Sequence, residues 1–545
     1  MAEYDFIIVG GGSAGCVLAN RLSADPAAKV LLLEAGGRDN KLIIKMPLAF
    51  VPASQRPELN WGYESEPDPT LDNRRLRVPR GKVLGGSSSI NGMMYARGHP
   101  RDFDQWRQLG NEGWAYADIL PYYKRLESDW RGAGTYHGGA GPLATVASDS
   151  NHPLYQTFMT TAKAAGFTES RDLNGATLEG FGPMDFNRLK GRRGSSAAAY
   201  LSPVLARPNL TVATGAMVRR IVIEKGRAVG VEYRREGKSA VARAGREVIL
   251  SGGTYNSPQL LMLSGIGPAD ALTPHGITPV LDLPGVGRNL QDHPNMLLRR
   301  MCVRPSGFDA QFRFDRLARE IVRWGLTGTG AMAGVPLLCM GFIRTRPELE
   351  RPDMQCYVNA VGFDTKVWFP GIRKANGDKI DWFNSFLHPE SRGHMTLRSA
   401  DPAAPPRIQF NLFDARADMV TMREAVKIAR DLMTRPPFGE FLGPEVIPGA
   451  QFQSDAEIEA AIRRFCTTTQ HPVGTCAMGH GPEAVVDPQL RVHGIAGLRV
   501  VDASVMPVIP GGNTNAPTIM IAEKASDMIL GLPPLPAAEG LEQAA

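Results

Sequence analysis

Three glycines near the N-terminus have the spacing that binds the phosphates of a dinucleotide. Gly10, Gly12 and Gly15 form a G-x-G-x-x-G pattern, which follows an apolar segment and opens a predicted helix. The first glycine allows a tight turn, the second lets the backbone approach a pyrophosphate, and the third lets the helix pack closely on the strand. The phosphates then meet the positive end of the helix dipole, next to Ser13 and Ala14. The pattern therefore predicts that this segment binds a nucleotide cofactor.

An acidic residue follows these glycines at the distance expected for ribose recognition. Glu34 lies 34 − 15 = 19 residues after Gly15 and ends an apolar segment at 29–34. A carboxylate at this position accepts hydrogen bonds from ribose hydroxyls and disfavours a 2′-phosphate, which argues against NADP. The pattern does not choose between FAD and NAD, and a glycine-rich turn without a ligand remains the alternative.

A sheet and a helix are needed to position these residues. Residues 4–9 and 29–34 are predicted to be buried parallel strands, and 13–23 to be a helix with apolar residues at helical spacing. Together they form a βαβ unit. Further predicted elements are a helix pair within 101–127, strands at 209–223, 227–235 and 247–251, a helix at 257–264, and a strand and helix within 497–530.

Residues 305–465 differ in character from the rest of the chain. They carry aromatic and amphipathic stretches, including a helix predicted at 313–325. We assign them to a second domain that shapes a substrate cavity, so the nucleotide-binding domain is discontinuous. The expected order is nucleotide domain at 1–155, substrate-domain segment at 156–204, nucleotide domain at 205–304, substrate domain at 305–464, nucleotide domain at 465–531 and disordered tail at 532–545.

Composition argues against several other classes of protein. The 545 residues are 43% hydrophobic and 21% charged, which is typical of a soluble globular protein with two or more domains. The net charge of +6 comes from interspersed residues without a basic stripe, so we expect no nucleic-acid partner. Six cysteines without a C-x-x-C pair, and histidines without metal-ligand spacing, predict no disulfide framework and no bound metal.

The chain shows no sign of insertion into a membrane. It begins without the pattern of a signal peptide and has no run of about 18 apolar residues. We therefore expect a cytoplasmic protein without a transmembrane helix, and leave open a peripheral contact with the inner membrane face.

Four further segments, at 79–92, 252–261, 471–479 and 501–515, carry a more specific signal. Their sequences are PRGKVLGGSSSING, GGTYNSPQLL, HPVGTCAMG and VDASVMP, the last running on to NTN at 513–515. In this order the chain resembles the glucose–methanol–choline (GMC) oxidoreductase family. The resemblance implies an α/β fold: a discontinuous Rossmann-type FAD-binding domain plus a substrate-binding domain with an antiparallel sheet and helices.

The resemblance also implies which residues contact the cofactor, FAD. Some relatives carry a histidine, covalently joined to the flavin, where this chain has Ile90, so we expect non-covalent FAD. His99, nine residues further on, is not that histidine. Besides the residues of the glycine motif and Glu34, the cofactor-binding positions are Ala35, Gly85, Gly86, Ser87, Asn91, Gly92, Met93, Val218, Asp502, Ala503, Asn513 and Thr514.

His471 and Asn513 match the catalytic pair of the family. The chemistry requires a base with a pKa near neutral to remove the alcohol proton, after which a hydride leaves the carbon for flavin N5. Asn513 is expected to hydrogen-bond the alcohol oxygen. A helix-capping role remains open for Asn513, although Asn515, two residues before Pro517, is the better candidate for the cap.

The expected activity is FAD-dependent oxidation of an alcohol to the aldehyde, with electrons passed to a quinone or another carrier. An alcohol oxidase that uses dioxygen and a non-redox hydroxynitrile-lyase-like flavoprotein are the alternatives. The substrate is expected to be a small-molecule alcohol, primary and apolar or extended. Candidate wall residues of its pocket are Phe312, Phe314, Trp324, Trp368, Phe369 and Trp382.

Overall fold

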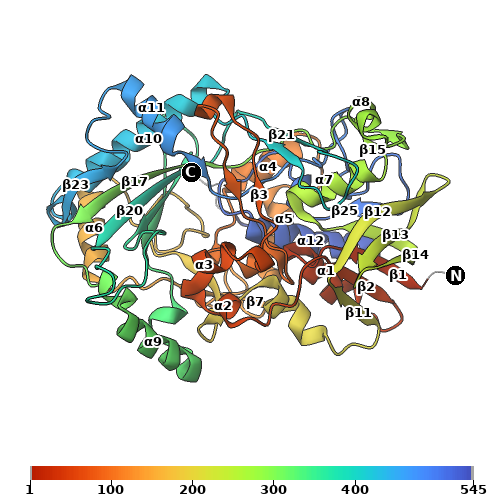
Figure 1. Cartoon of the computed structure of the whole chain (residues 1–545), viewed down its shortest axis with the longest axis horizontal. Helices are drawn as coiled ribbons and strands as arrows, with labels where there is room; N and C mark the ends of the chain where they lie inside the picture. Colours follow the sequence, from red (N-terminus) through yellow and green to blue (C-terminus); the bar gives the residue numbers. More distant parts are fainter. Residues whose placement is uncertain (1–2, 542–545) are drawn as a thin grey trace.

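The computed structural model describes residues 3–541, and the half on the right of Figure 1 is built on a sheet with a parallel core. The order of the core strands is β11-β2-β1-β14-β25. Strand β14 begins in an antiparallel extension with β13 and β12 and ends in this core. The strands are β1 (Tyr4–Val9), β2 (Val30–Glu34), β11 (Leu210–Thr214), β12 (Ala216–Glu224), β13 (Arg227–Arg235), β14 (Lys238–Leu250) and β25 (Leu498–Val500).

Helices complete this half of the molecule. Helix α1 (Ser13–Leu22) connects β1 to β2 and packs against α12 (Asn515–Leu530), which packs in turn on α5 (Tyr116–Leu126). Every residue of β2 is buried, as expected for a parallel strand covered on both faces. The predicted βαβ unit is confirmed. Helix α7 (Gly253–Leu263) begins four residues before the prediction, so that Pro258 lies inside it and not at its start.

An antiparallel sheet is the core of the other half, on the left of Figure 1. Its order is β23-β17-β20-β19-β18-β8, with β24 beside β17. Helix α10 (Arg416–Thr434) packs on β20 and β17, and α11 (Asp455–Phe465) packs on α10. The strands are β8 (Gly180–Gly182), β17 (Pro294–Cys302), β18 (Leu337–Ile343), β19 (Met354–Asn359), β20 (Lys379–Phe386), β23 (Leu442–Ile447) and β24 (Thr467–Thr468). The expected fold class is confirmed.

Two strands of the antiparallel sheet lie in ranges that the sequence assigned to the nucleotide domain. β17 lies within 205–304 and β24 within 465–531, yet they pair with each other. The reason is that the segment before β17 and the segment after β24 run side by side, with Gln291 and Val473 exchanging backbone hydrogen bonds of 3.1 and 2.9 Å. The chain therefore crosses between the two halves at these paired segments and not at 304 and 465.

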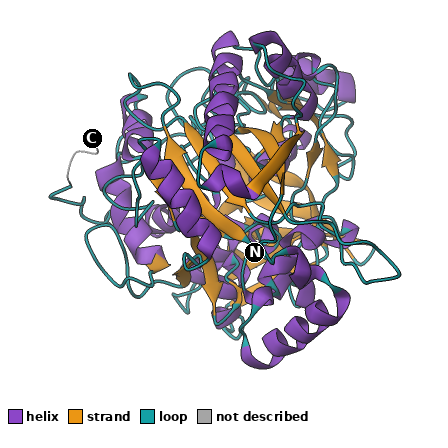
Figure 2. Ribbon diagram, turned by 90° about the vertical axis from the view of Figure 1, so that its left-hand side faces the viewer, coloured by secondary structure: helices purple, strands orange, loops and turns teal. Residues whose placement is uncertain are grey.

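A third, smaller sheet and several short elements connect the two halves. The small sheet has the order β10-β9-β7-β6, with β5 beside β9. In Figure 2 helices surround the sheets. Further elements are α2 (Leu42–Lys45), α3 (Phe50–Ser54), α4 (Pro100–Gln108), α9 (Phe314–Thr327) and the 3-10 helix η4 (Gly86–Ser89). The remaining strands and α-helices are β3 (Tyr63–Glu64), β4 (Arg77–Val78), β5 (Met94–Tyr95), β6 (Glu127–Ser128), β7 (Leu143–Ala147), α6 (Pro153–Ala164), β9 (Asp185–Leu189), β10 (Arg192–Arg193), β15 (Ile266–Gly267), α8 (Ala269–Leu272), β16 (Leu281–Asp282), β21 (His394–Thr396) and β22 (Arg407–Gln409).

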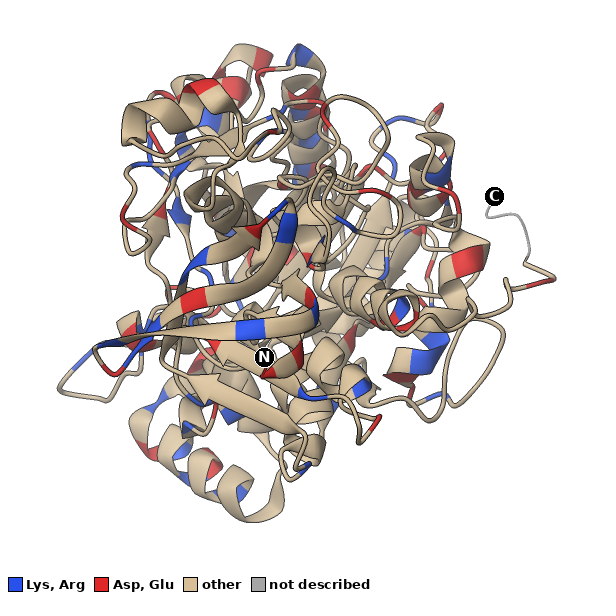
Figure 3. Ribbon diagram, turned by 90° about the vertical axis from the view of Figure 1, so that its right-hand side faces the viewer, with Lys and Arg blue, Asp and Glu red and all other residues tan. Residues whose placement is uncertain are grey.

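The charge on the surface and the course of the C-terminal segment bear on two other expectations, namely interspersed charges and a disordered tail. On the side seen in Figure 3, basic and acidic residues are interspersed. Residues 532–541 of the expected tail lie against α5, where Leu535 N donates to Tyr122 Oη and Ala538 N to Ala117 O; residues 542–545 lie outside the described part. No helix within residues 3–541 has the length and apolar character needed to cross a membrane.

Candidate active site

The glycine motif leaves room for a ligand at one of its three glycines. Gly10 has φ +103°, and a Cβ there would lie 2.4 Å from the Ser251 carbonyl oxygen. A Cβ on Gly15 would lie 1.9 Å from the carbonyl oxygen of Gly10, because helix and strand touch at that point. The nearest neighbour of a Cβ on Gly12 would be 3.8 Å away. Gly10 and Gly15 thus serve the turn and the packing, while the space beside Gly12 opens into a cavity.

Two helices begin at this cavity. Helix α1 starts at Ser13 and α12 at Asn515, and neither has a side-chain cap. Ser13 Oγ donates to Asn515 Oδ1 over 2.8 Å and so joins the two helix starts. Uncapped N–H groups and the positive ends of two helix dipoles suit a pyrophosphate. Asn515 is therefore the first residue of its helix and not the predicted cap, whose position Thr514 occupies.

Glu34, the acid expected to bind ribose, ends β2 and lines the cavity. Glu34 accepts hydrogen bonds from Gly11 N at 2.8 Å and Gly36 N at 2.7 Å. Its burial raises the pKa of the carboxyl to about 7, although both N–H groups act in the opposite direction. Ala35 and Val218 line the cavity beside it.

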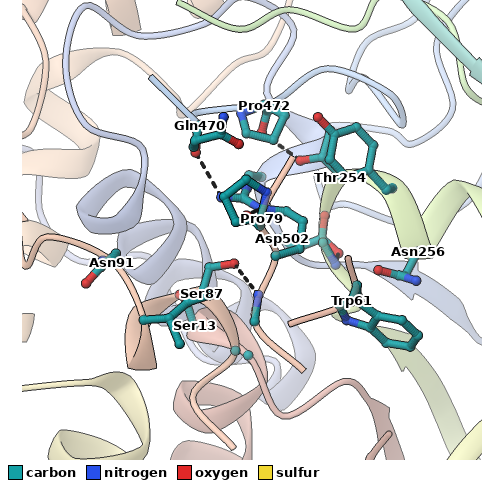
Figure 4. Close-up of a pocket in the computed structure, with 18 of the residues that line it drawn as sticks. Ser13, Trp61, Pro79, Ser87, Asn91, Thr254, Asn256, Gln470, Pro472 and Asp502 are labelled. Atoms are coloured by element: carbon teal, nitrogen blue, oxygen red, sulfur yellow. Dashed lines mark hydrogen bonds between the residues drawn. The ribbon is translucent and has the colours of Figure 1, made fainter. Parts of the chain in front are cut away.

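The serine-rich segment closes over the glycine motif. Gly85 N donates to Gly11 O over 2.7 Å, and a Cβ on Gly86 would lie 2.8 Å from Gly12 Cα. Ser87 and Asn91 line the cavity, and both are labelled in Figure 4. Gly85 itself lies behind the wall and positions the loop. The other residues of the segment at 85–93 that line the cavity are Gly86, Ile90, Gly92 and Met93.

Asn91 and Ile90 define the character of this wall. The buried guanidinium of Arg193 donates to Asn91 O at 2.6 Å and Asn91 Oδ1 at 2.9 Å, which fixes the amide. Ile90 offers only a hydrocarbon side chain, which cannot form a bond to a flavin. The wall therefore fits a cofactor that is held without a covalent link at this position.

A cavity of about 580 Å³ runs from these elements to the C-terminal loops. Asp502 lines it but is also a structural clamp, because its Oδ2 accepts from Gly253 N at 2.8 Å and Ser257 Oγ at 2.6 Å. The predicted residues that line the cavity are Gly10, Gly12, Ser13, Ala14, Glu34, Ala35, Gly86, Ser87, Asn91, Gly92, Met93, Val218, His471, Asp502, Ala503, Asn513 and Thr514. Close glycines, uncapped helix starts and a ribose acid along one cavity fit FAD.

His471 stands at the far end of this cavity. It follows β24 in the segment that pairs with the residues before β17, and its N–H donates to Asp292 Oδ1 over 2.8 Å. The next residue, Pro472, accepts a 2.7 Å hydrogen bond from Thr254 Oγ1 of α7, as Figure 4 shows. His471 Nε2 lies 3.0 Å from Asn513 Nδ2. The two predicted catalytic residues are thus in contact.

Asn513 is held in a single orientation by two residues that the sequence did not single out. Gln355 Nε2 donates to Asn513 Oδ1 over 3.2 Å, and Asn513 Nδ2 lies 3.3 Å from Tyr357 Oη. Tyr357 closes the ring by donating to Gln355 Oε1 over 2.6 Å. Because the Asn513 oxygen is occupied by a donor, its NH₂ group faces His471 Nε2, which must carry a lone pair.

A second histidine, which the sequence did not single out, lies directly behind the first. His293 Nδ1 is 3.0 Å from His471 Nδ1. Because Nε2 of His471 is an acceptor, the ring proton of His471 is on Nδ1, and this N–H donates to Nδ1 of His293. Burial lowers the pKa of His471 well below its usual range, and His293 and Arg80 lower it further. Burial also lowers the pKa of His293 to about 3. Both rings are therefore neutral, and burial places the pKa of His471 below the near-neutral value that was expected for the base.

The aromatic wall differs from the prediction. None of Phe312, Phe314, Trp324, Trp368, Phe369 and Trp382 lines the cavity. Trp382 faces the buried cluster beneath α10, while its neighbour Phe383 on β20 faces the cavity, since alternate residues of a strand point to opposite faces. The aromatic residues that line the cavity are Trp61, Tyr255, Tyr357, Phe50, Phe363 and Phe383.

Charged groups are unevenly distributed along the cavity. Among the described residues that line it, the carboxylates are Glu34 and Asp502, and both belong to the nucleotide-binding half. The end near His471 is lined by amides and hydroxyls, including Asn295, Asn359 and Thr469, and by the guanidinium of Arg80. With a cation and no carboxylate among these lining residues, this end disfavours a cationic molecule.

Comparison with known proteins agrees with this geometry. The chain matches two models of the GMC oxidoreductase family, over residues 4–295 and 389–522. Oxygen-dependent choline dehydrogenases of Sinorhizobium medicae and Chromohalobacter salexigens are each 44% identical to it, over 98% of this chain and 96% of theirs.

Solved structures resemble it across nearly the whole chain. Pyridoxine 4-oxidase from Mesorbium loti matches with a TM-score of 0.86 and 31% identity, over 96% of this chain and 98% of that one. A variant of Aspergillus oryzae formate oxidase matches with a TM-score of 0.89 and 28% identity, over 97% and 98%. The chain belongs to the GMC oxidoreductase family and is an FAD-dependent oxidoreductase acting on CH–OH donors.

Proposed function

We propose that this protein oxidises an uncharged primary alcohol to the aldehyde, with His471 as the base that accepts the hydroxyl proton. The observation that carries the proposal is the contact of 3.0 Å between His471 Nε2 and Asn513 Nδ2 at the end of the cavity that fits FAD. A neutral imidazole whose Nε2 lone pair faces an amide donor and a cavity is an arrangement that can activate a hydroxyl placed against both groups.

The mechanism follows from these two side chains. An alcohol oxygen between them accepts a hydrogen bond from Asn513 Nδ2 and donates its own proton toward His471 Nε2. As the proton moves to Nε2, the hydrogen bond from Nδ1–H to His293 Nδ1, 3.0 Å long, holds the ring in the orientation that receives it. When bound, the flavin supplies the hydride acceptor. The protein residues therefore hold the oxygen and take the proton while the carbon loses its hydride.

The lining near His471 supports an uncharged substrate. A cationic alcohol such as choline would be favoured by a carboxylate, and the described residues at this end of the cavity offer none. Asn295 and Asn359 can bind hydroxyl or ether oxygens, and Phe363 and Phe383 are stacked with ring centroids 5.0 Å apart. An apolar or extended alcohol fits both features.

Choline is the second candidate, because relatives that are 44% identical carry the name choline dehydrogenase. Aromatic rings such as Trp61 also bind quaternary ammonium groups through their faces. One face of Trp61 is, however, already covered by Lys82 Nζ, 4.6 Å from the ring centroid. This cation opposes a second cation at the same site.

For the electron acceptor we propose a quinone or another organic carrier. Dioxygen is the alternative acceptor that the experiment below tests. The support is that the relatives at 44% identity are named dehydrogenases, whereas the oxidases match at 28–31%. Those relatives are nevertheless named oxygen-dependent choline dehydrogenases, so dioxygen is tested directly.

The experiment mixes the holoenzyme with aliphatic, aromatic, polyether and amino alcohols without oxygen and follows the flavin absorbance. We expect uncharged primary alcohols to bleach the flavin faster than choline, and a quinone or dye to reoxidise it. Faster bleaching by choline would contradict the substrate class, and peroxide release in air at the same rate would contradict the acceptor. A flavin that no alcohol bleaches would indicate a non-redox lyase.

A further inference from the structure

Helix α9 carries an apolar face that the protein does not cover. Its inner side packs through buried Trp324, with Leu317 and Ile321, against Met46 and Met332. A second apolar face points to solvent and consists of Phe314, Val322 and Leu326, the last 82% exposed. A surface helix that serves only its own core is polar on the outside. The outer face of α9 is therefore more apolar than the outer face of an ordinary surface helix.

The loop at 366–374 extends this face. The two segments are joined by backbone hydrogen bonds between Phe314 N and Trp368 O and between Trp368 N and Phe312 O, 2.9 and 3.1 Å long. Phe314 and Phe369 are in edge contact with ring centroids 6.5 Å apart. Val367, Phe369 and Ile372 are exposed, Ile372 by 85%. We call the outer face of α9 together with residues 366–374 the α9 surface.

Positive charges flank these apolar side chains. Arg316, Arg319, Lys366, Arg373 and Lys374 are exposed on the α9 surface. None of the five forms an ion pair with another residue between 3 and 541. The acidic residues on the same elements are already neutralised, Asp315 by Arg313 and Glu320 by Arg323. The α9 surface is therefore both apolar and cationic.

The α9 surface lies beside the mouth of the active-site cavity. The inner side of α9 contacts Leu48 and Ala49, and the next residue, Phe50, lines the cavity. Phe50 and Phe363 are in edge contact at 5.6 Å, and Phe363 lines the cavity while 46% exposed. In Figure 1 α9 projects from the molecule at the lower left, on the side of α2 and α3. Whatever binds the α9 surface therefore lies next to the entrance.

We propose that the α9 surface binds the headgroup region of an anionic phospholipid bilayer, which places the cavity mouth at the lipid surface. Apolar side chains flanked by Lys and Arg are the composition of elements that lie in the interface plane of a membrane. Each Lys or Arg near an anionic bilayer contributes about 1 kcal/mol, or roughly fivefold in affinity. The inference concerns an interaction surface and does not depend on the substrate or acceptor proposed above.

A second copy of the chain fits this surface less well. In a two-fold dimer the same patch meets itself, so the cations of the α9 surface would face those of the partner. Like charges that are brought together and desolvated in this way oppose association. A bilayer with anionic headgroups supplies the opposite charge to all of them.

The first test is sedimentation of the holoenzyme with vesicles of phosphatidylcholine alone or with 30% phosphatidylglycerol. We expect binding to the anionic vesicles to be at least about tenfold tighter and to be lost in 0.5 M NaCl, because screening removes the electrostatic part. Equal binding to both kinds of vesicle, or binding to neither, overturns the proposal.

Variants locate the surface. The pair Leu326→Gln and Ile372→Gln is expected to weaken binding about tenfold or more, since both side chains leave the acyl boundary. The pair Lys366→Gln and Lys374→Gln is expected to weaken it about twentyfold at low salt.

Matched controls elsewhere on the molecule are Val280→Gln, an exposed valine, and Lys238→Gln, an exposed lysine. Both controls should bind as the unchanged protein does, and all variants should keep their flavin and their rate with a water-soluble alcohol, because none of these residues lines the cavity. Equal loss in the controls, or a concentration-dependent dimer that Leu326→Gln abolishes, contradicts the membrane assignment.

Discussion

Two buried histidine environments in this molecule have opposite electrostatic character. His137, near the small sheet, lies between Asp172 Oδ2 at 2.8 Å and Glu127 Oε2 at 3.1 Å. Burial alone would lower its pKa, but the two carboxylates outweigh burial and raise the pKa to about 9. His471, at the cavity, has an amide and a second imidazole as its ring partners, and its pKa is lowered.

The difference separates a structural role from a chemical one. A buried histidine that is charged and bonded at both nitrogens is held by its partners and has nothing left to offer a ligand. Around His137 the cluster is completed by Arg97, which donates to Glu127, and Arg131, which pairs with Asp129. His471 is kept neutral, and its Nε2 faces a cavity. The ring partners therefore decide what the same burial leads to: carboxylates hold His137 charged within the fold, whereas an amide and an imidazole leave His471 neutral and able to accept a proton.

The largest expected effect comes from removing the base. His471→Ala should lower the rate of flavin reduction by alcohol by about 10²- to 10⁴-fold, the range of general-base contributions. The flavin content should stay unchanged, because His471 is not part of the glycine-rich cradle. Rapid anaerobic mixing measures the rate, with His480→Ala, an exposed histidine, as the matched control. Full activity in His471→Ala would contradict the assignment of the base.

The complementary change at the other histidine should affect stability and not rate. His137→Gln should lower the free energy of unfolding by about 3 kcal/mol, because it leaves buried carboxylates without their partner. Since the folded-state pKa is raised from 6.5 to about 9, this stabilisation is complete below pH 6.5 and is lost as the pH rises through 9. Denaturation of the holoenzyme at pH 6 and pH 10 measures it. A rate loss comparable to that of His471→Ala would abolish the distinction between the two regions.

Asn513 tests whether the amide acts on the substrate or only on His471. Asn513→Ala should reduce kcat roughly ten- to a hundredfold, because a hydrogen bond to a developing negative charge is worth about 1.5–3 kcal/mol. Asn513→His keeps a donor at this point and should recover part of the rate. Steady-state kinetics with separate kcat and KM values decides between the two roles. A change in KM alone would show that Asn513 binds the alcohol without assisting the reaction.

The sequence predicts the parts of this site that are contained in single segments. The glycine motif, Glu34 and the segment at 85–93 are local patterns, and the structure brings them to one cavity with His471 and Asn513. Partners contributed by neighbouring strands were missed, because the direction of a side chain on a strand depends on register. Phe383 lines the cavity and Trp382 does not, although they are adjacent on β20.

Gln355 and Tyr357 show the same limit. They lie two residues apart on β19, and both point toward Asn513, more than 150 residues away in the sequence. One signal could have located them: residues i and i+2 of a strand share a face, so a polar pair at this spacing in the substrate domain is a candidate for a common site. The sequence alone does not say which element that face meets.

The smallest expected effect concerns the histidine that accepts from the base. His293→Leu removes the acceptor of the His471 Nδ1 proton, and loss of one neutral hydrogen bond of about 1 kcal/mol should slow flavin reduction roughly fivefold. Because His293 also lowers the pKa of His471, its removal should move the acid limb of the kcat/KM profile to higher pH. His293→Gln, which keeps an acceptor, should restore most of the rate. A uniform loss of rate at every pH, without rescue by Gln, would mean that His293 only fills space. His471 would then act without the help of the second histidine.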